Sequence, residues 1–161
     1  MGSPTPTLIG NIIDYIYTML DTALPASSGY GILLDPDDLT NNPAEILKSG
    51  YGVSVEDAQN TEREITGGVY WYRRNFTIVL VRSVLSLYSD AATRKQGIKD
   101  VLEDLNLVLQ QMKGTRVVTI ANVQTAFDFK FVHDSGPRPT QIGDIPYFFI
   151  ELTISAEYRQ T

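Results

Sequence analysis

The 161-residue chain contains no cysteine and only one histidine, His133. The lack of cysteine excludes disulfides, zinc–thiolate sites, iron–sulfur clusters and cysteine nucleophiles. The chain also has no phosphate-binding glycine loop, dinucleotide-binding glycine run or zinc-binding helix motif. Asp134 and Ser135 follow His133 directly, but catalytic triads are recognised by spatial roles and are not normally built from adjacent residues. We therefore expect no catalytic site, no metal and no cofactor, and we interpret His133 as a solvated loop residue.

Positive charge is also scarce. The chain has 13 lysines and arginines against 19 aspartates and glutamates, which gives a net charge of −6 and a pI of about 4.7. Binding to a phosphate backbone depends on clustered basic residues, so this balance argues against a general nucleic-acid-binding protein. An enclosed surface built from such a chain would repel DNA.

The longest apolar stretch, residues 8–24, does not predict a targeting or membrane segment. No lysine or arginine precedes it, and Asp14 and Asp21 interrupt it, which is unlike a signal peptide. It is too short and too charged to span a bilayer. We expect it to form a helix of a protein that folds in the cytoplasm without a membrane partner.

The hydrophobic pattern predicts one α+β domain over residues 1–161. Apolar residues recur at helical spacing over about 7–23 and 91–112. Segments rich in β-branched and aromatic residues predict strands at about 53–57, 64–72, 75–87, 126–132 and 147–158. Runs of strands separated by single helices are typical of a mainly antiparallel sheet with two principal helices packed on it.

The last predicted strand shows the clearest alternation. It predicts an inward face of Phe148, Ile150, Leu152, Ile154 and Ala156, and an outward face of Glu151, Thr153, Ser155 and Glu157. The same pattern points Phe127, Phe129 and Phe131 to one side of the preceding strand.

Two stretches rich in proline and glycine predict long loops, at about 25–52 and 134–146. Loops of this length are often functional or become ordered on a partner. The tetrapeptide Ser-Gly-Tyr-Gly occurs twice, at 28–31 and 49–52, and we interpret both copies as loop segments with an aromatic anchor. Two copies do not make a repeat architecture.

Two acidic groups are candidates for a surface that faces a partner or lines a lumen. The first is Asp35, Asp37 and Asp38 in the first predicted loop, and the second is Asp100, Glu103 and Asp104 on the outer face of the second helix. The first group lacks the ligand positions and the closing glutamate of a calcium-binding EF-hand loop, so we interpret it as solvated.

An aromatic–arginine segment is the candidate subunit interface. It comprises Tyr70, Trp71, Tyr72, Arg73 and Arg74, which are residue types enriched in protein interfaces. Glu62 and Glu64 precede it, and in a self-associating ring they could pair with the arginines of the next subunit. The alternative is that the tyrosines cover one sheet face while both arginines meet solvent.

The order of these elements resembles the tail terminator proteins of siphophages, which are known in lambda and T5 types. The resemblance rests on the segments Tyr51 to Ala58, Val69 to Arg82 and Asp100 to Met112, and it is closest to the T5 type. It implies a virion protein at the head-proximal end of the tail, assembled in the host cytoplasm. It also implies a homo-hexameric ring that caps the tail tube, stops polymerisation of the tube protein and then docks a head-completion or connector protein. DNA would pass through the ring without specific binding.

Other classes remain open at this stage. Another ring-forming neck or connector protein of a phage would obey the same physics at a different position. A small ligand-binding domain or enzyme with an aromatic pocket is disfavoured by the single histidine and the missing cofactor motifs.

Overall fold

The computed structural model describes residues 8–25, 30–32, 49–65, 69–83, 91–112, 118–120, 123–142 and 145–159. Together these residues form an α+β fold, as the sequence pattern predicts. Its elements, in chain order, are α1 (Leu8–Ala23), β1 (Tyr30–Ile32), β2 (Ser49–Ile65), β3 (Val69–Ser83), α2 (Ala91–Met112), β4 (Val118–Ile120), β5 (Val123–Asp134), β6 (Arg138–Ile142) and β7 (Ile145–Arg159).

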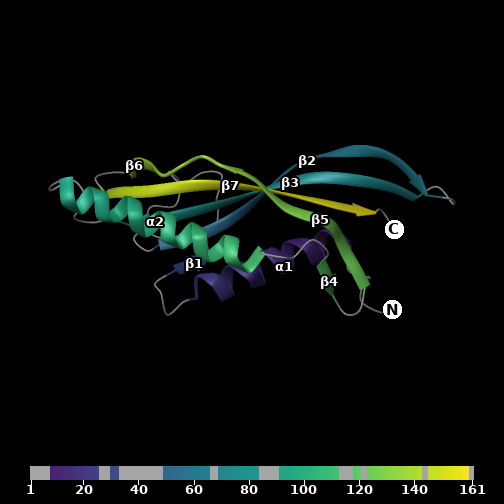
Figure 1. Ribbon diagram of the computed structural model, residues 1–161, viewed down its shortest axis with the longest axis horizontal. Coiled ribbons are helices and arrows are strands. Elements are labelled where there is room, and N and C mark those ends of the chain that lie inside the picture. The colour runs from purple at the N-terminus through teal and green to yellow at the C-terminus, as the bar shows by residue number, and fades with distance from the viewer. Residues whose placement is uncertain are drawn as a thin grey trace.

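The strands form one mixed sheet in the order β1-β2-β3-β7-β5-β4, with β6 paired to β7 beside β5. Only β1 and β2 pair in parallel among the described strands. β3 and β7 lie at the centre and stay in register from Trp71 opposite Arg159 to Ser83 opposite Tyr147. Both helices lie on the same side of the sheet (Figure 1).

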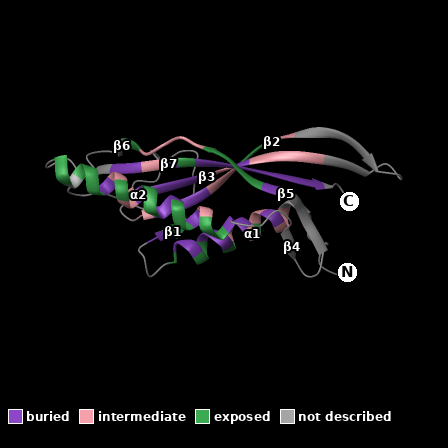
Figure 2. Ribbon diagram, viewed as in Figure 1, coloured by how far each residue is buried: buried purple, intermediate pink, exposed green. Residues whose placement is uncertain are grey.

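The hydrophobic core lies between the helices and the two central strands. Ile12, Ile16 and Leu20 recur every four residues and therefore share one face of α1. That face and its counterpart on α2 pack against apolar side chains of β3 and β7, and the buried residues follow this boundary in Figure 2. Full burial of one large apolar side chain stabilises the fold by about 1.5–3 kcal/mol. Packing of the two helices against one face of the sheet therefore contributes most to the stability of the fold.

Both predicted helices are confirmed. α1 ends where Leu24 donates its backbone N–H to the carbonyl of Leu20 at 2.7 Å, and Pro25 follows, which has no N–H to continue the pattern. α2 covers 91–112 and buries Val101 and Val108. Asp90 and Gly114 flank this range and are residue types that commonly cap a helix at its start and end, but both lie outside the described residues.

The predicted strand at 64–72 is wrong. Instead, β2 ends at Ile65, β3 begins at Val69, and the two strands form a long antiparallel hairpin in which Glu64 pairs with Tyr70. The apolar and aromatic residues on both sides of Gly67-Gly68 produced one apparent strand. A glycine pair between two such runs is typical of a hairpin that joins two strands.

The two predicted loops also contain strands. The first includes β1 and the start of β2, where Tyr30 pairs with Ser49 and Ile32 with Tyr51. The two Ser-Gly-Tyr-Gly copies therefore contribute to adjacent parallel strands, and the rings of Tyr30 and Tyr51 stack with centroids 6.4 Å apart. The sequence pattern does not predict this pairing, because a strand of three residues is too short to show the alternation of apolar and polar residues.

The second predicted loop contains β6, which pairs antiparallel with β7 from Arg138 opposite Phe149 to Ile142 opposite Ile145. β5 and β6 follow one edge of β7 in succession, interrupted at residues 135–137. There, Ser135 donates its N–H to the Glu151 carbonyl at 2.9 Å, and its hydroxyl accepts the Glu151 N–H at 3.0 Å. Gly136 has a φ of 69°, a left-handed conformation that glycine adopts without a steric penalty.

One prediction about side-chain exposure is wrong. Thr153, Ser155 and Glu157 do lie opposite the inward set on β7, but all three are buried, because β7 has neighbouring strands on both edges. On β5, Phe129 is buried, and Phe131, which pairs with the core residue Ile154, is 41% exposed.

Candidate functional site

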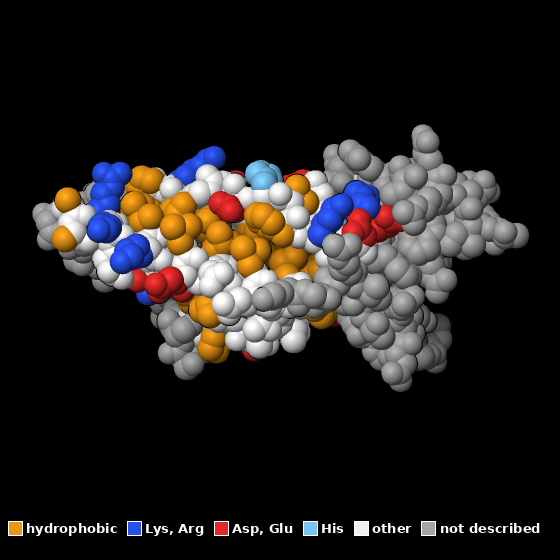
Figure 3. Space-filling view, in the orientation of Figure 1, with side chains coloured by type: hydrophobic (Ala, Val, Ile, Leu, Met, Phe, Trp, Pro, Cys, Tyr) orange, Lys and Arg blue, Asp and Glu red, His pale blue; other side chains and the backbone are white. Residues whose placement is uncertain are grey.

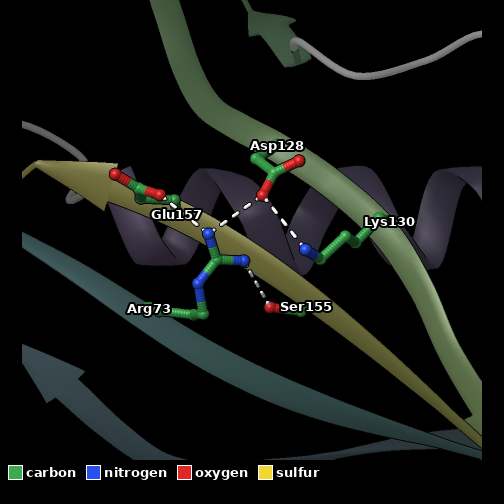
Figure 4. A network of polar contacts seen from close by, with 5 residues as sticks. All are labelled: Arg73, Asp128, Lys130, Ser155 and Glu157. Atoms are coloured by element: carbon green, nitrogen blue, oxygen red, sulfur yellow. Dashed lines mark hydrogen bonds and ion pairs between the residues drawn. The ribbon is translucent and has the colours of Figure 1, made fainter. Parts of the chain in front are cut away.

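The part of the β2–β3 hairpin nearest its turn is joined to the rest of the sheet by an ion-pair network centred on Arg73 (Figure 4). Arg73 on β3 is in register with Glu157 on β7, and its Nη2 lies 2.8 Å from the Glu157 Oε2. The same nitrogen lies 2.9 Å from the Asp128 Oδ2 on β5, and Nη1 donates to the Ser155 hydroxyl at 3.1 Å. One guanidinium thus connects three adjacent strands. We name the set Arg73, Asp128, Lys130, Ser155 and Glu157 the Arg73 cluster.

Asp128 reaches this cluster because its backbone is irregular. Its φ is 46°, and the register of β5 on β7 shifts between Phe127 and Lys130. Aspartate tolerates this left-handed conformation better than most residues. The hydrogen bond from Arg73 holds the pKa of the Asp128 carboxyl below its usual range, and Lys130, whose Nζ lies 3.3 Å from the Asp128 Oδ2, acts in the same direction.

On the opposite face of the sheet from Arg73, Arg74 and Tyr72 make further contacts that hold the same part of β3. Arg74 donates from Nε to the Tyr158 hydroxyl at 3.2 Å and from Nη1 to the Glu56 carbonyl at 2.5 Å. The rings of Tyr72 and Tyr158 lie 6.0 Å apart. Both arginines are therefore bound within their own chain and do not simply meet solvent. Their pairing with Glu62 and Glu64 of another subunit stays a prediction.

Asp104 is not on the outer face of α2, so the prediction that placed it there is wrong. It is buried, and its Oδ2 lies 2.6 Å from Nη1 of Arg82 and accepts a hydrogen bond from the Tyr30 hydroxyl. Burial, followed by this contact with Asp104, raises the pKa of Tyr30. Through these contacts, Asp104 on α2 links Tyr30 on β1 to Arg82 at the end of β3. Helical spacing did not reveal this role, because the partners are distant in sequence.

The remaining predicted residues are only partly described. Glu103 is exposed, and Asp100 is half-buried and accepts a hydrogen bond from Gln96 at 2.9 Å. The backbones of Glu62, Glu64, Tyr70 and Trp71 lie in the hairpin, but their side chains fall outside the described set. Asp35, Asp37 and Asp38 also lie outside the described residues.

Several large apolar side chains are exposed, and the sequence pattern did not single them out. They are Ile32, Val55, Leu102, Leu107, Phe131 and Val132. Figure 3 shows hydrophobic side chains gathered in a band over α2 and the neighbouring strands. Single exposed apolar residues are ordinary, whereas a gathering of them indicates a surface that contacts a partner.

The described residues provide no cluster typical of metal binding. Within them, no three histidine, aspartate or glutamate side chains gather as a metal site would require. No described helix is long and apolar enough to cross a bilayer. His133 is exposed as expected, although it lies on β5 and not in a loop.

No protein-family model matches the chain, and no curated protein is significantly similar to it.

Proposed function

We propose that the chain is a structural phage virion protein that forms a hexameric ring on the end of the tail tube. In this role it stops polymerisation of the tube protein and then presents a docking face to the head-completion or connector protein. The observation that carries the proposal is the β2–β3 hairpin, which extends beyond both helices (Figure 1) and agrees with the element order that resembles tail terminators.

The Arg73 cluster supports this role because it anchors the hairpin. Hydrogen bonds that involve charged groups are roughly twice as strong as neutral ones, and here they join β3 to two neighbouring strands. Arg74 adds a second attachment through Tyr158 on β7. A hairpin held close to its turn keeps its direction when it contacts a neighbour, which lowers the entropy lost on assembly.

The charge of the chain is consistent with a ring through which DNA passes. Six copies with a net charge of −6 each attract no phosphate backbone, so DNA would slide without forming lasting contacts. The proposed lumen or partner face keeps Asp35, Asp37, Asp38, Asp100 and Glu103. Asp104 is removed from this set because it is buried beside Arg82.

An assembly reaction tests the proposed function. Purified chain would be added to polymerising tube subunits of the same phage, and tube lengths would be measured by negative-stain electron microscopy. We expect tubes to shorten as the chain is added, with one ring at a tube end and a hexamer mass in native mass spectrometry. Particles made without the chain should carry overlong or unjoined tails. Unchanged tubes in vitro together with normal tails in such particles would exclude the terminator role.

A further inference from the structure

At its two opposite ends, the described sheet has strands with no second described strand beside them. On β5, β4 pairs only as far as Ala126, so residues 128–134 have β7 on one side and no described strand on the other. On β2, β1 pairs only with residues 49–51, and no described strand follows that side of β2 beyond Tyr51. Two backbone groups in that stretch are satisfied in other ways, because Val53 donates its N–H to the Tyr17 hydroxyl at 3.3 Å and the Glu56 carbonyl accepts from Arg74. Proteins normally protect such edges, because unpaired N–H and C=O groups attract another strand.

Exposed apolar side chains gather at these same two edges. Phe131 and Val132 belong to β5, while Val55 and Ile32 belong to β2 and β1, so four of the six large apolar side chains exposed in the described residues lie there. Phe131 pairs with Ile154, and Val55 pairs with Phe76; both partners belong to the core. Phe131 and Val55 therefore lie on the helix-covered face of the sheet, at opposite ends.

The charges beside these apolar residues are complementary. Lys130 precedes Phe131, is about half exposed and lies 3.3 Å from Asp128. Glu56 follows Val55, is exposed and accepts a hydrogen bond from the Thr77 hydroxyl. Like charges at matching positions would have opposed contact between the two edges. Opposite charges instead favour contact and help to set its register.

From these three observations we infer that the β5 edge of one copy pairs with the β2 edge of a second copy. Phe131 would then pack beside Val55 on one continuous face, with Lys130 close to Glu56. The contact uses two different surfaces of the same chain, so each copy keeps one free edge of each kind, and repetition closes a ring or forms an open chain. This inference rests on the proposed ring and names the interface that would build it.

Cysteine cross-linking tests the pairing directly, because the chain has no cysteine of its own. Val55→Cys and Val132→Cys would be made in separate chains, which leaves Phe131 in place, and treated with a short bis-maleimide. We expect covalent dimers when the two variants are mixed and none when either is treated alone. Cross-links within a single variant would instead show that like edges meet, which would overturn the inference.

Substitution at the apolar contact provides a second test. Phe131→Lys should weaken association by about tenfold or more, because it places a charge in the centre of the interface. The matched control is Leu107→Lys on α2, since Leu107 is 42% exposed and Phe131 41%, and Leu107 belongs to neither edge. Adding Val55→Glu to Phe131→Lys should restore association by pairing the two new charges.

Light scattering and thermal unfolding would be recorded for every variant. Unfolding midpoints close to wild type would show that Phe131→Lys acts on association alone. A hexamer that persists in Phe131→Lys, with no cross-link between mixed Val55→Cys and Val132→Cys chains, would overturn the edge pairing while leaving the ring intact. A chain that stays monomeric at high concentration and on tube ends would instead remove the proposed function itself.

Discussion

At the scale of single residues, Asp128 shows how an irregular backbone position can be useful. Its left-handed φ of 46° places its carboxylate beside both Arg73 and Lys130. Such a conformation costs of order 1–3 kcal/mol in a residue other than glycine and persists when the surroundings determine it. Here the surroundings are two cations, and the bulge that bends β5 also supplies the carboxylate that links β5 to β3.

The lowered pKa of Asp128 gives a prediction for stability against pH. A carboxyl whose pKa is lower in the folded state binds fewer protons there, so its contribution is fully present above its unfolded pKa and is lost as pH falls through its folded pKa. We expect the free energy of unfolding to fall less between pH 6 and 3, roughly spanning the unfolded pKa of about 3.9, in Asp128→Asn than in wild type. The difference should be modest, because Asp128 is 38% exposed and water screens the pair.

Urea unfolding at a series of pH values measures this slope. Asp14→Asn is the control, since Asp14 is an exposed aspartate on α1 without a described cation partner. It should keep the slope of wild type. An Asp128→Asn chain with the same slope as wild type would show that the ion pair with Arg73 does not persist in solution.

At the scale of elements, the short strand β1 depends on a contact made by α2. Asp104→Ala leaves the buried Tyr30 hydroxyl and the Arg82 guanidinium without the carboxylate that they share. We expect a loss of about 2–3 kcal/mol in the free energy of unfolding, below the largest values for buried pairs because Arg82 is partly exposed. Chemical denaturation measures the loss.

A double-mutant cycle with Tyr30→Phe separates this contact from general damage to α2. The two substitutions should be less than additive, because Tyr30→Phe removes a donor that has already lost its acceptor in Asp104→Ala. Asp100→Ala on the same helix should cost less, because Asp100 is only half-buried and its described partner is Gln96. Strict additivity would mean that Tyr30 and Asp104 stabilise the fold independently.

The elements also show which parts of the fold the sequence could predict. α1, α2 and β7 have long periodic patterns, and their existence and type were predicted correctly. β1 and β6 are three and five residues long and rich in glycine or proline, so they resembled loops. The Arg73 cluster could not be predicted, because Arg73 meets Asp128 and Glu157 across 55 and 84 residues of sequence. Arg73 and Arg74 are predicted interface residues because of their residue type. Residue type does not distinguish partners within the chain from partners outside it.

At the scale of the whole molecule, long-range repulsion opposes assembly. Each copy carries a net charge of −6, and the screening length falls from about 30 Å at 0.01 M salt to about 8 Å at 0.15 M. The pairing of Lys130 with Glu56 would act against this trend, but exposed ion pairs contribute only about 0–1 kcal/mol. Repulsion over the whole surface therefore dominates, and added sodium chloride should strengthen ring formation.

Analytical ultracentrifugation at 0.01 and 0.15 M sodium chloride measures this effect, and we expect the dissociation constant to fall several-fold at the higher concentration. Glu56→Gln is the informative variant, because it removes one member of the proposed pair at the surface and leaves a net charge of about −5 on each copy. Without that attraction, only repulsion responds to salt, so the variant should be favoured by salt at least as strongly as wild type. Association that weakens with salt in wild type but not in Glu56→Gln would show the reverse: that the Lys130–Glu56 contact, and not the apolar pair of Phe131 and Val55, contributes most to the interface.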